Sequence, residues 1–390
     1  MKFQSVFWDL AFRPLFLAAS LLSIFSLLVW ALILNGAINW QPLLSPVLWH
    51  VHEMIFGFAL TVAVGFLLTA VQNWTGLRSL NGKGLALLCS LWLLARLLIW
   101  QGIWPANTAL FIALLIIQAS WWTVFIFFFA RLLVRAQSRR NYLFIPLLSI
   151  IAVLNLVFIQ LSFSGQEQAA LHLAQSAILF FAVVIAVIAG RIMPMFTRNG
   201  CRMAGIHTDI KATDKTDKIL LWLSLCGASS FLLDFWLDLF YQPAWILISV
   251  GLLHLYRQAH WAPFVTLPVP LLWSLHLSYL CLGLGVILIG ISKLTSLLAT
   301  GDAFHLLTVG TLGGMILAMI SRVSLGHTGR ALQVNTQMSV AFSLIFGAAL
   351  MRLLLPLIDL HLLGWNLSVL CWCLAFALFC RNYFPILTKA

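Results

Sequence analysis

The sequence predicts an all-α integral membrane protein, a polytopic bundle of about 12 transmembrane helices. Two observations lead to this prediction. Of the 390 residues, 63% are hydrophobic and only 8% are charged, whereas a soluble domain carries roughly 25% charged residues. The hydrophobic residues also occur in blocks of about 20, the length that an α-helix needs to cross the hydrocarbon core of a bilayer. A soluble enzyme is therefore excluded.

Short polar stretches separate the hydrophobic blocks and define the individual helices. The predicted spans are 15–34, 47–71, 84–101, 107–130, 142–162, 168–190, 218–239, 243–256, 268–291, 303–322, 336–358 and 361–380. The eighth is short, and Pro194 is expected to break the helix after the sixth. The longest loop, 192–217, has 26 residues. We therefore expect a single integral membrane domain, 1–390, embedded in the lipid bilayer.

The basic residues predict the orientation of the bundle. Lys and Arg number 22 against 10 Asp and Glu, which gives a net charge of +12. If both termini are cytoplasmic, the alternation of loops puts 19 of the 22 on the cytoplasmic side; only Lys293 lies opposite, and Arg96 and Arg352 lie within spans. This distribution follows the positive-inside rule. The positive charge therefore reports topology, and no nucleic-acid partner is expected.

A weak internal repeat relates three of the predicted helices. In the second span His52 is followed 23 residues later by Thr75, and in the tenth His305 is followed 23 residues later by Thr328. His172 occupies the corresponding place near the start of the sixth span. Because these spans are four apart, the chain can be divided into three units of four helices, 1–140, 141–262 and 263–390. A chance alignment of His and Thr is the alternative.

Four histidines are predicted to lie at one depth of the membrane. With the orientation above, His50, His52, His172 and His305 are all near the outer ends of their spans. An ionisable residue inside a membrane is a functional candidate, because leaving it unpaired there is costly. Neutral imidazole is a common ligand of iron, copper and zinc. The alternative is that each histidine only forms a hydrogen bond to a neighbouring helix.

The repeat suggests how these histidines are divided between metals. It pairs His52 with His305, which makes them the first choice for the two axial ligands of one haem. On a regular helix His50 lies about 200° from His52, so the two do not easily bind one ion. His50, His172 and His276 are then left for a second metal, and imidazole ligands favour copper.

His327 and two arginines complete the candidate site. His327 follows the tenth span and is a candidate for binding a ligand or taking up protons. Arg96 and Arg352 lie toward the outer ends of their spans, where their guanidinium groups could hold haem propionates. The alternative is that Arg96 pairs with Glu53 and that Arg352 pairs with Asp359 or extends toward the outer surface.

Several segments of the chain occur in an order that is specific to one family. They are Phe12-Arg13-Pro14-Leu15-Phe16, His50-Val51-His52-Glu53-Met54, Trp74-Thr75-Gly76, Gly190-Arg191, Leu275-His276, His305 with Leu307-Thr308, and the LGHTGR sequence that ends at Arg330. Together they resemble the NnrS family of bacterial multi-span membrane proteins over almost the whole chain.

The resemblance implies a protein of the bacterial cytoplasmic (inner) membrane that contains haem b and copper and takes part in the response to nitric oxide and nitrosative stress. Nitric oxide or an NO-derived species is then the small-molecule partner. The arrangement of three times four helices also resembles the catalytic subunit of haem-copper oxidases, whose second, sixth and tenth helices carry metal-ligating histidines. The seventh span here has no His pair, so oxygen reduction is not expected.

Three functions are compatible with the sequence. The first is a haem and copper protein that binds or detoxifies NO-derived species. The second is an enzyme similar to quinol-linked nitric oxide reductases, with quinol or another electron donor as partner. The third is a secondary transporter of copper or haem, because bundles built from repeats are common among transporters. The sequence identifies no catalytic residue, so it does not decide whether the protein is an enzyme.

Overall fold

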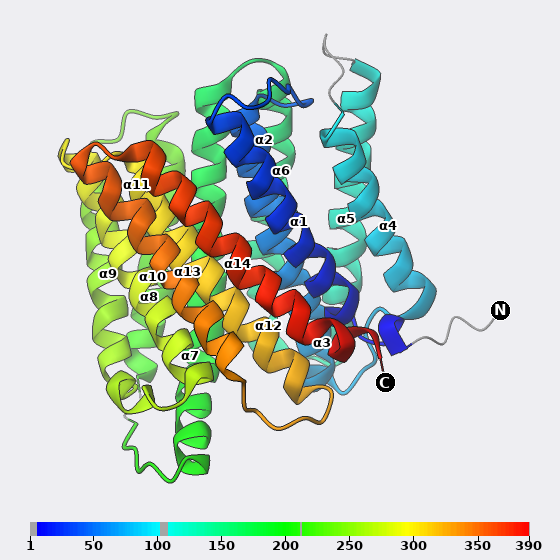
Figure 1. Ribbon diagram of the computed structural model, residues 1–390, viewed down its shortest axis with the longest axis vertical. Coiled ribbons are helices and arrows are strands. Elements are labelled where there is room, and N and C mark those ends of the chain that lie inside the picture. Colours follow the sequence, from blue (N-terminus) through cyan, green and yellow to red (C-terminus); the bar gives the residue numbers. More distant parts are fainter. Residues whose placement is uncertain (1–5, 102–107, 211–212, 390) are drawn as a thin grey trace. The chain divides into compact units, whose positions relative to one another are not determined.

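The computed structural model describes residues 6–101, 108–210 and 213–389, and every regular element within them is a helix (Figure 1). Eleven of these helical segments are long and apolar enough to cross a membrane. The prediction of an all-α, multi-span membrane protein is therefore confirmed.

The helices follow the predicted spans closely. Their bounds are α1 Phe12–Leu34, α2 Pro46–His52, α3 Leu60–Thr75, α4 Gly82–Ile99, α5 Thr108–Arg135, α6 Phe144–Phe163, α7 Glu167–Met203, α8 Asp214–Asp234, α9 Pro243–Ala259, α10 Pro270–Leu294, α11 Thr300–His305, α12 Gly314–Gly326, α13 Thr336–Leu354 and α14 His361–Thr388. Two segments are π-helical, η2 Glu53–Ala59 between α2 and α3 and η5 Leu306–Gly313 between α11 and α12. Short 3-10 turns are η1 Val6–Trp8, η3 Arg139–Asn141, η4 Pro263–Thr266 and η6 Leu355–Ile358.

The predicted eighth span is the exception to the count of 12. It corresponds to α9, which has only 17 residues and is not among the 11 segments long enough to cross. At 1.5 Å per residue such a helix is about 25 Å long, less than the roughly 30 Å of a hydrocarbon core.

The expected break at Pro194 is wrong, because α7 continues through this residue to Met203. Proline lacks the N–H that would bond to the carbonyl of Gly190. Membrane helices tolerate this loss where neighbouring groups compensate. Arg257 approaches α7 one turn before the freed carbonyl and donates from Nη2 to the carbonyl of Ala186 at 3.0 Å. A Cβ atom on Gly190 would lie 2.8 Å from Nη1 of Arg257, so the glycine gives the arginine its room.

The chain divides into two compact units. The first contains Met1–Ala177, Val323–Arg330 and Cys380–Ala390, and the second contains Ile178–Arg322 and Ala331–Phe379. These limits differ from the three predicted four-helix units, which stay a prediction.

In the first unit, α1 packs against η2 and α3, and α5 packs against α4 and α6 (Figure 1). Arg13, near the start of α1, donates to the carbonyl oxygens of Ile386 and Leu387 at 3.1 Å and of Lys389 at 2.9 Å. The start of α1 and the end of α14 therefore lie at the same end of this unit.

In the second unit, α10 packs against α9, α11 and η5. The contact with α9 is close because both helices carry glycine there: a Cβ atom on Gly251 would lie 2.5 Å from the carbonyl oxygen of Gly283. Small residues at such positions are typical of helix packing in membranes.

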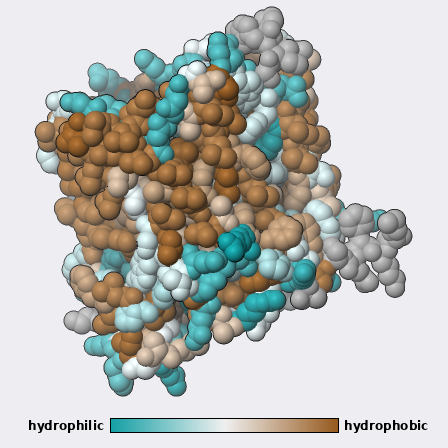
Figure 2. Space-filling view, in the orientation of Figure 1, coloured by the Kyte–Doolittle hydropathy of each residue, from teal (hydrophilic) through white to brown (hydrophobic). Residues whose placement is uncertain are grey.

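The outer surface is hydrophobic, as a lipid-facing surface must be. Large apolar side chains such as Phe25, Ile116 and Trp222 are more than half exposed. Figure 2 shows hydrophobic residues over most of the face in view, with the hydrophilic ones mainly toward its upper and lower ends.

Candidate functional site: the buried histidines

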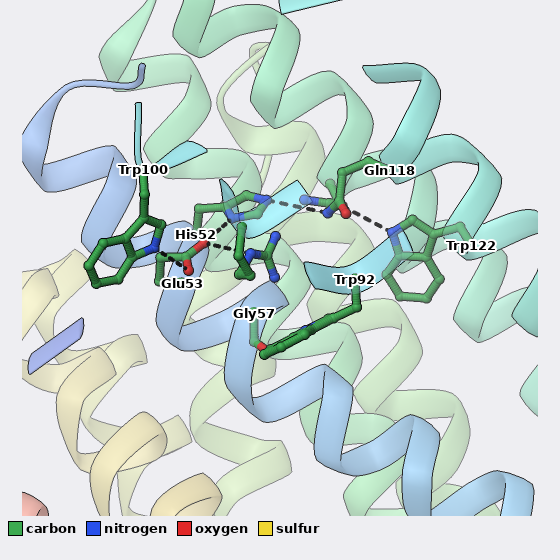
Figure 3. A network of polar contacts seen from close by, with 9 residues as sticks. His52, Glu53, Gly57, Trp92, Trp100, Gln118 and Trp122 are labelled. Carbon is green, nitrogen blue, oxygen red and sulfur yellow. Dashed lines mark hydrogen bonds and ion pairs between the residues drawn. The ribbon is translucent and has the colours of Figure 1, made fainter. Parts of the chain in front are cut away.

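His52 is the last residue of α2 and is completely buried in the first unit, next to the equally buried Glu53. Nδ1 of His52 lies 3.1 Å from Oε1 of Glu53 (Figure 3). The same carboxylate lies 3.2 Å from Nε of Arg96 and accepts a 3.0 Å hydrogen bond from Nε1 of Trp100. The alternative prediction that Arg96 pairs with Glu53 is therefore what the structure shows.

The Glu53 carboxylate determines which nitrogen of His52 carries the proton. An ionised carboxylate can only accept hydrogen bonds, so Nδ1 of His52 must be the donor and Nε2 must carry the lone pair. Metal-ligating histidines show this arrangement, in which a carboxylate fixes the tautomer and increases the basicity of the other nitrogen. Arg96 and Trp100 in turn keep the buried carboxylate ionised and in place.

The glycine at position 57, within η2, makes this arrangement possible. A Cβ atom there would lie 3.0 Å from Nη1 of Arg96 and 2.9 Å from a methyl group of Leu22. Its carbonyl oxygen accepts a 3.1 Å hydrogen bond from Nε1 of Trp92 (Figure 3). A side chain at this position would therefore require Leu22 and the Arg96 guanidinium to shift.

Nε2 of His52 faces a group of amide and indole side chains from α5 and α6. The nearest polar atom that contacts it is Nε2 of Gln118, at 3.5 Å. Gln118 and Trp122 each donate to Oδ1 of Asn155 at 3.0 Å. Nδ2 of Asn155 is buried and has no partner among the described residues. The lone pair of His52 therefore has only a long contact, and a neighbouring amide donor lacks an acceptor.

His305 has a similar setting in the second unit. It is the last residue of α11, and its Nδ1 lies 2.6 Å from the carbonyl oxygen of Gly301. Because a carbonyl can only accept, Nε2 of His305 again carries the lone pair. One turn earlier, Asp302 forms an ion pair with Arg352, whose guanidinium carbon lies 5.3 Å from the ring centroid of Trp365.

A π-helical segment follows each of these two histidines. His52 precedes η2 and His305 precedes η5, and a glycine stands five residues after each, at Gly57 and Gly310. π-helices are rare and often mark functional positions. Each histidine also has a buried carboxylate paired with an arginine nearby. These shared local features support the proposed repeat between the second and tenth spans.

The three histidines predicted to bind copper lie in different local environments. In the first unit, His50 stacks on Trp30 with ring centroids 4.6 Å apart, and His172 is buried in α7. In the second unit, Nε2 of His276 lies 2.8 Å from Oγ1 of Thr197.

His327 lies just beyond the end of α12, with its ring centroid 5.8 Å from that of Phe12. Partial burial lowers the pKa of this imidazole, which therefore favours the neutral form at neutral pH.

His50 and His52 both belong to α2, in the first unit, whereas His305 belongs to the second unit. Within the described ranges, no three His, Cys, Asp or Glu side chains are close enough to hold one metal ion. The pairing of His52 with His305 and the copper set of His50, His172 and His276 each draw on both units, so they stay predictions.

One prediction about the arginines is wrong. Arg352 pairs with Asp302 and not with Asp359. Asp359 has a positive φ of 61° just after η6, and its side chain is fully exposed, so it points away from the bundle. Haem propionates at Arg96 or Arg352 would share the guanidinium with a carboxylate of the protein.

Sequence reasoning missed several residues around His52, namely Trp100, Gln118, Trp122 and Asn155. Gln118 and Asn155 are amides in the middle of apolar spans. Because an amide is costly to bury in hydrocarbon unless it is hydrogen-bonded, their position was a usable signal. The indole groups gave none, since the chain has 17 Trp.

Comparisons with known proteins agree with the resemblance found in the motifs. No curated protein matches the chain at a significant level. The family model described as NnrS protein matches residues 6–390, and the chain therefore belongs to the NnrS family.

Proposed function

We propose that this protein binds haem b and copper in the bacterial inner membrane, with both termini in the cytoplasm, and binds or detoxifies NO-derived species during the response to nitric oxide. Membership of the NnrS family supports the physiological context. The single observation that carries the cofactor proposal is the setting of His52, whose Nδ1 is engaged by a buried carboxylate.

The residues present fit an imidazole-bound metal. Nε2 of His52 carries the lone pair, its contact with Gln118 is long at 3.5 Å, and Nδ2 of Asn155 lacks a partner close by. A group bound to Nε2 would take the place of the long amide contact. When bound, haem iron supplies a centre that takes up diatomic ligands or exchanges electrons, depending on its surroundings.

This chain's own residues hold and orient the ligand. The Glu53 carboxylate keeps the proton of His52 on Nδ1, and Arg96 balances its charge. His305 is the second proposed haem ligand, because the carbonyl of Gly301 fixes the same tautomer. The proposed copper ligands are drawn from His50, His172 and His276, with His327 as a further candidate.

The proposal is tested on protein purified from cells supplied with haem and copper. An optical spectrum should show a Soret band, and metal analysis should find iron and copper. His52→Ala and His305→Ala should each lose the Soret band, whereas His207→Ala, in an exposed loop, should keep it. If the wild type contains neither haem nor copper, the cofactor proposal is wrong.

A second measurement separates binding from catalysis. Reduced protein in vesicles is mixed with nitric oxide, and the concentration of the gas is followed with an electrode. Stoichiometric loss indicates binding, whereas continued loss with excess electron donor indicates a reductase. If His207→Ala and His52→Ala remove nitric oxide equally well, His52 is not part of the site.

A further inference from the structure

The two ring nitrogens of His276 have different surroundings. This residue lies in α10 and is only 4% exposed. Its Nε2 lies 2.8 Å from Oγ1 of Thr197 in α7, which is also buried. Its Nδ1 is buried and has no hydrogen-bond partner among the described residues. Both residues belong to the second unit. One nitrogen is therefore engaged, and the other is left unsatisfied.

Two neighbouring helices hold the backbone around His276 closely. From α9, Nε2 of Gln258 donates to the backbone carbonyl of His276 at 2.5 Å. From α7, Gly200 approaches the preceding turn of α10, where a Cβ atom on this glycine would lie 2.8 Å from a methyl carbon of Leu272. The contact between Thr197 and Nε2 of His276 is therefore part of a close helix packing.

The burial of both nitrogens favours one tautomer of the neutral ring. A neutral imidazole has one N–H donor and one lone pair. With the proton on Nδ1, a buried N–H would lack an acceptor, and buried N–H groups are left without partners less often than acceptors are. With the proton on Nε2, the ring donates to the Thr197 hydroxyl and Nδ1 carries the lone pair. A metal ion can satisfy this lone pair, whereas it could not satisfy an N–H.

This arrangement is the reverse of that at His52 and His305. In those two histidines Nδ1 is engaged, by Glu53 and by the carbonyl of Gly301, and Nε2 carries the lone pair. Either nitrogen of an imidazole can bind a metal, and the hydrogen bond at the other nitrogen decides which one does. His276 therefore offers the opposite nitrogen from the two proposed haem ligands, which agrees with its assignment to a second metal.

We propose that His276 binds copper through Nδ1 and that Thr197 is its positioning residue, which accepts a hydrogen bond from Nε2. This proposal rests on the proposed function, in which His276 is a copper ligand. The Thr197 hydroxyl keeps the proton on Nε2 and so keeps the lone pair of Nδ1 available to the metal. The partner of the second nitrogen also fixes the orientation of the ring in metal-ligating histidines.

The first experiment reads the tautomer of His276 directly. Full-length protein with isotope-labelled histidine is reconstituted in lipid bilayers after a chelator has removed copper, and nitrogen NMR distinguishes protonated from unprotonated ring nitrogens. The signals of His276 are identified by their loss in His276→Asn. In the wild type Nε2 should be protonated and Nδ1 should not. Thr197→Val should lose this preference, whereas Thr197→Ser, which keeps the hydroxyl, should retain it.

The second experiment measures copper affinity by competition with a chelator. Thr197→Val should bind copper about 10–100-fold more weakly than the wild type, as expected when a ligating histidine loses the partner of its other nitrogen. Thr197→Ser should bind copper like the wild type. Thr311→Val is the matched control, because Thr311 is also buried in the second unit but its hydroxyl has no partner among the described residues. It should bind copper like the wild type.

The outcomes distinguish the role of Thr197 from the proposed function. If the wild type binds no copper, the copper part of the proposed function is wrong, and the role of Thr197 is wrong with it. If the wild type and Thr197→Val bind copper equally well, the proposed function stands but the role of Thr197 is wrong. It is also wrong if Nδ1 of His276 is protonated in the wild type, or if Thr311→Val weakens copper binding as much as Thr197→Val. Should Thr197→Val not fold, Thr197→Ala takes its place.

Discussion

The Glu53–Arg96 ion pair can be tested by removing its charges one at a time and together. Both side chains are almost completely buried, at 0% and 5% exposed, and Oε1 of Glu53 lies 3.2 Å from Nε of Arg96. Removing one partner leaves the other as an uncompensated buried charge, which costs about 3–5 kcal/mol. Glu53→Gln and Arg96→Gln should therefore each lower the free energy of unfolding by about this amount.

The double variant distinguishes an ion pair from two independent contributions. Independent effects would add to about 6–10 kcal/mol. If the cost arises from the charge left behind, the double variant should lose less stability than either single variant and lie close to the wild type, since neither charge remains. The assay is reversible unfolding in mixed micelles, repeated for all four proteins at one detergent composition.

The exposed ion pair between Arg78 and Asp9 supplies the control. Its atoms are 3.6 Å apart and its side chains are 68% and 52% exposed. Arg78→Gln should change the free energy of unfolding by less than about 1 kcal/mol. The reasoning is refuted if the effects of Glu53→Gln and Arg96→Gln are additive, or if either is as small as that of Arg78→Gln.

Three further predictions follow from single contacts. Trp100→Phe removes one hydrogen bond to a buried carboxylate and should cost about 1.5–3 kcal/mol of unfolding free energy, whereas Trp222→Phe, 66% exposed, should cost little; equal losses would contradict the assignment. Arg352→Gln should destabilise the protein and Asp359→Asn should not, because the carboxylate partner of Arg352 lies in α11; a thermal melt compares the two. Because burial lowers the pKa of His327, its folded form binds protons less readily than the unfolded chain, so this residue reduces stability as the pH falls below about 6.5. His327→Gln should therefore lose slightly less thermal stability than the wild type between pH 7.5 and pH 5.5, and a larger loss would contradict this sign.

The helices were predictable because their main determinant is local. A block of about 20 apolar residues can be satisfied in a bilayer only as a helix, since the backbone must pair within the segment. The failure at Pro194 shows the limit of this argument. Helix α7 continues through Pro194, and Arg257, 63 residues further on in the sequence, packs against it one turn earlier, at the carbonyl of Ala186.

The buried ionisable residues of the candidate site, and the pairing of Arg96 with Glu53, could be predicted from the sequence, but the partner of Arg352 could not. An ionisable residue in an apolar span is conspicuous, so His52, Glu53 and Arg96 could be selected from the sequence. The partner of Arg352 could not, because the carboxylate nearest in sequence, Asp359, is exposed, whereas the actual one is 50 residues away. Such pairings depend on which helices pack together.

The two π-helical segments show that similar backbones can present histidines with different chemistry. His52 and His305 each end an α-helical turn before a π-helical segment, and in each Nε2 carries the lone pair. Their Nδ1 acceptors differ, since one is the Glu53 carboxylate and the other is the carbonyl of Gly301. A carboxylate draws the proton more strongly and makes Nε2 the better electron donor. If His52 binds a metal as proposed, removing this carboxylate by Glu53→Gln should weaken the binding by about 10–100-fold. Asp302→Asn should not change the metal affinity proposed for His305, because Asp302 pairs with Arg352 and not with Nδ1 of His305.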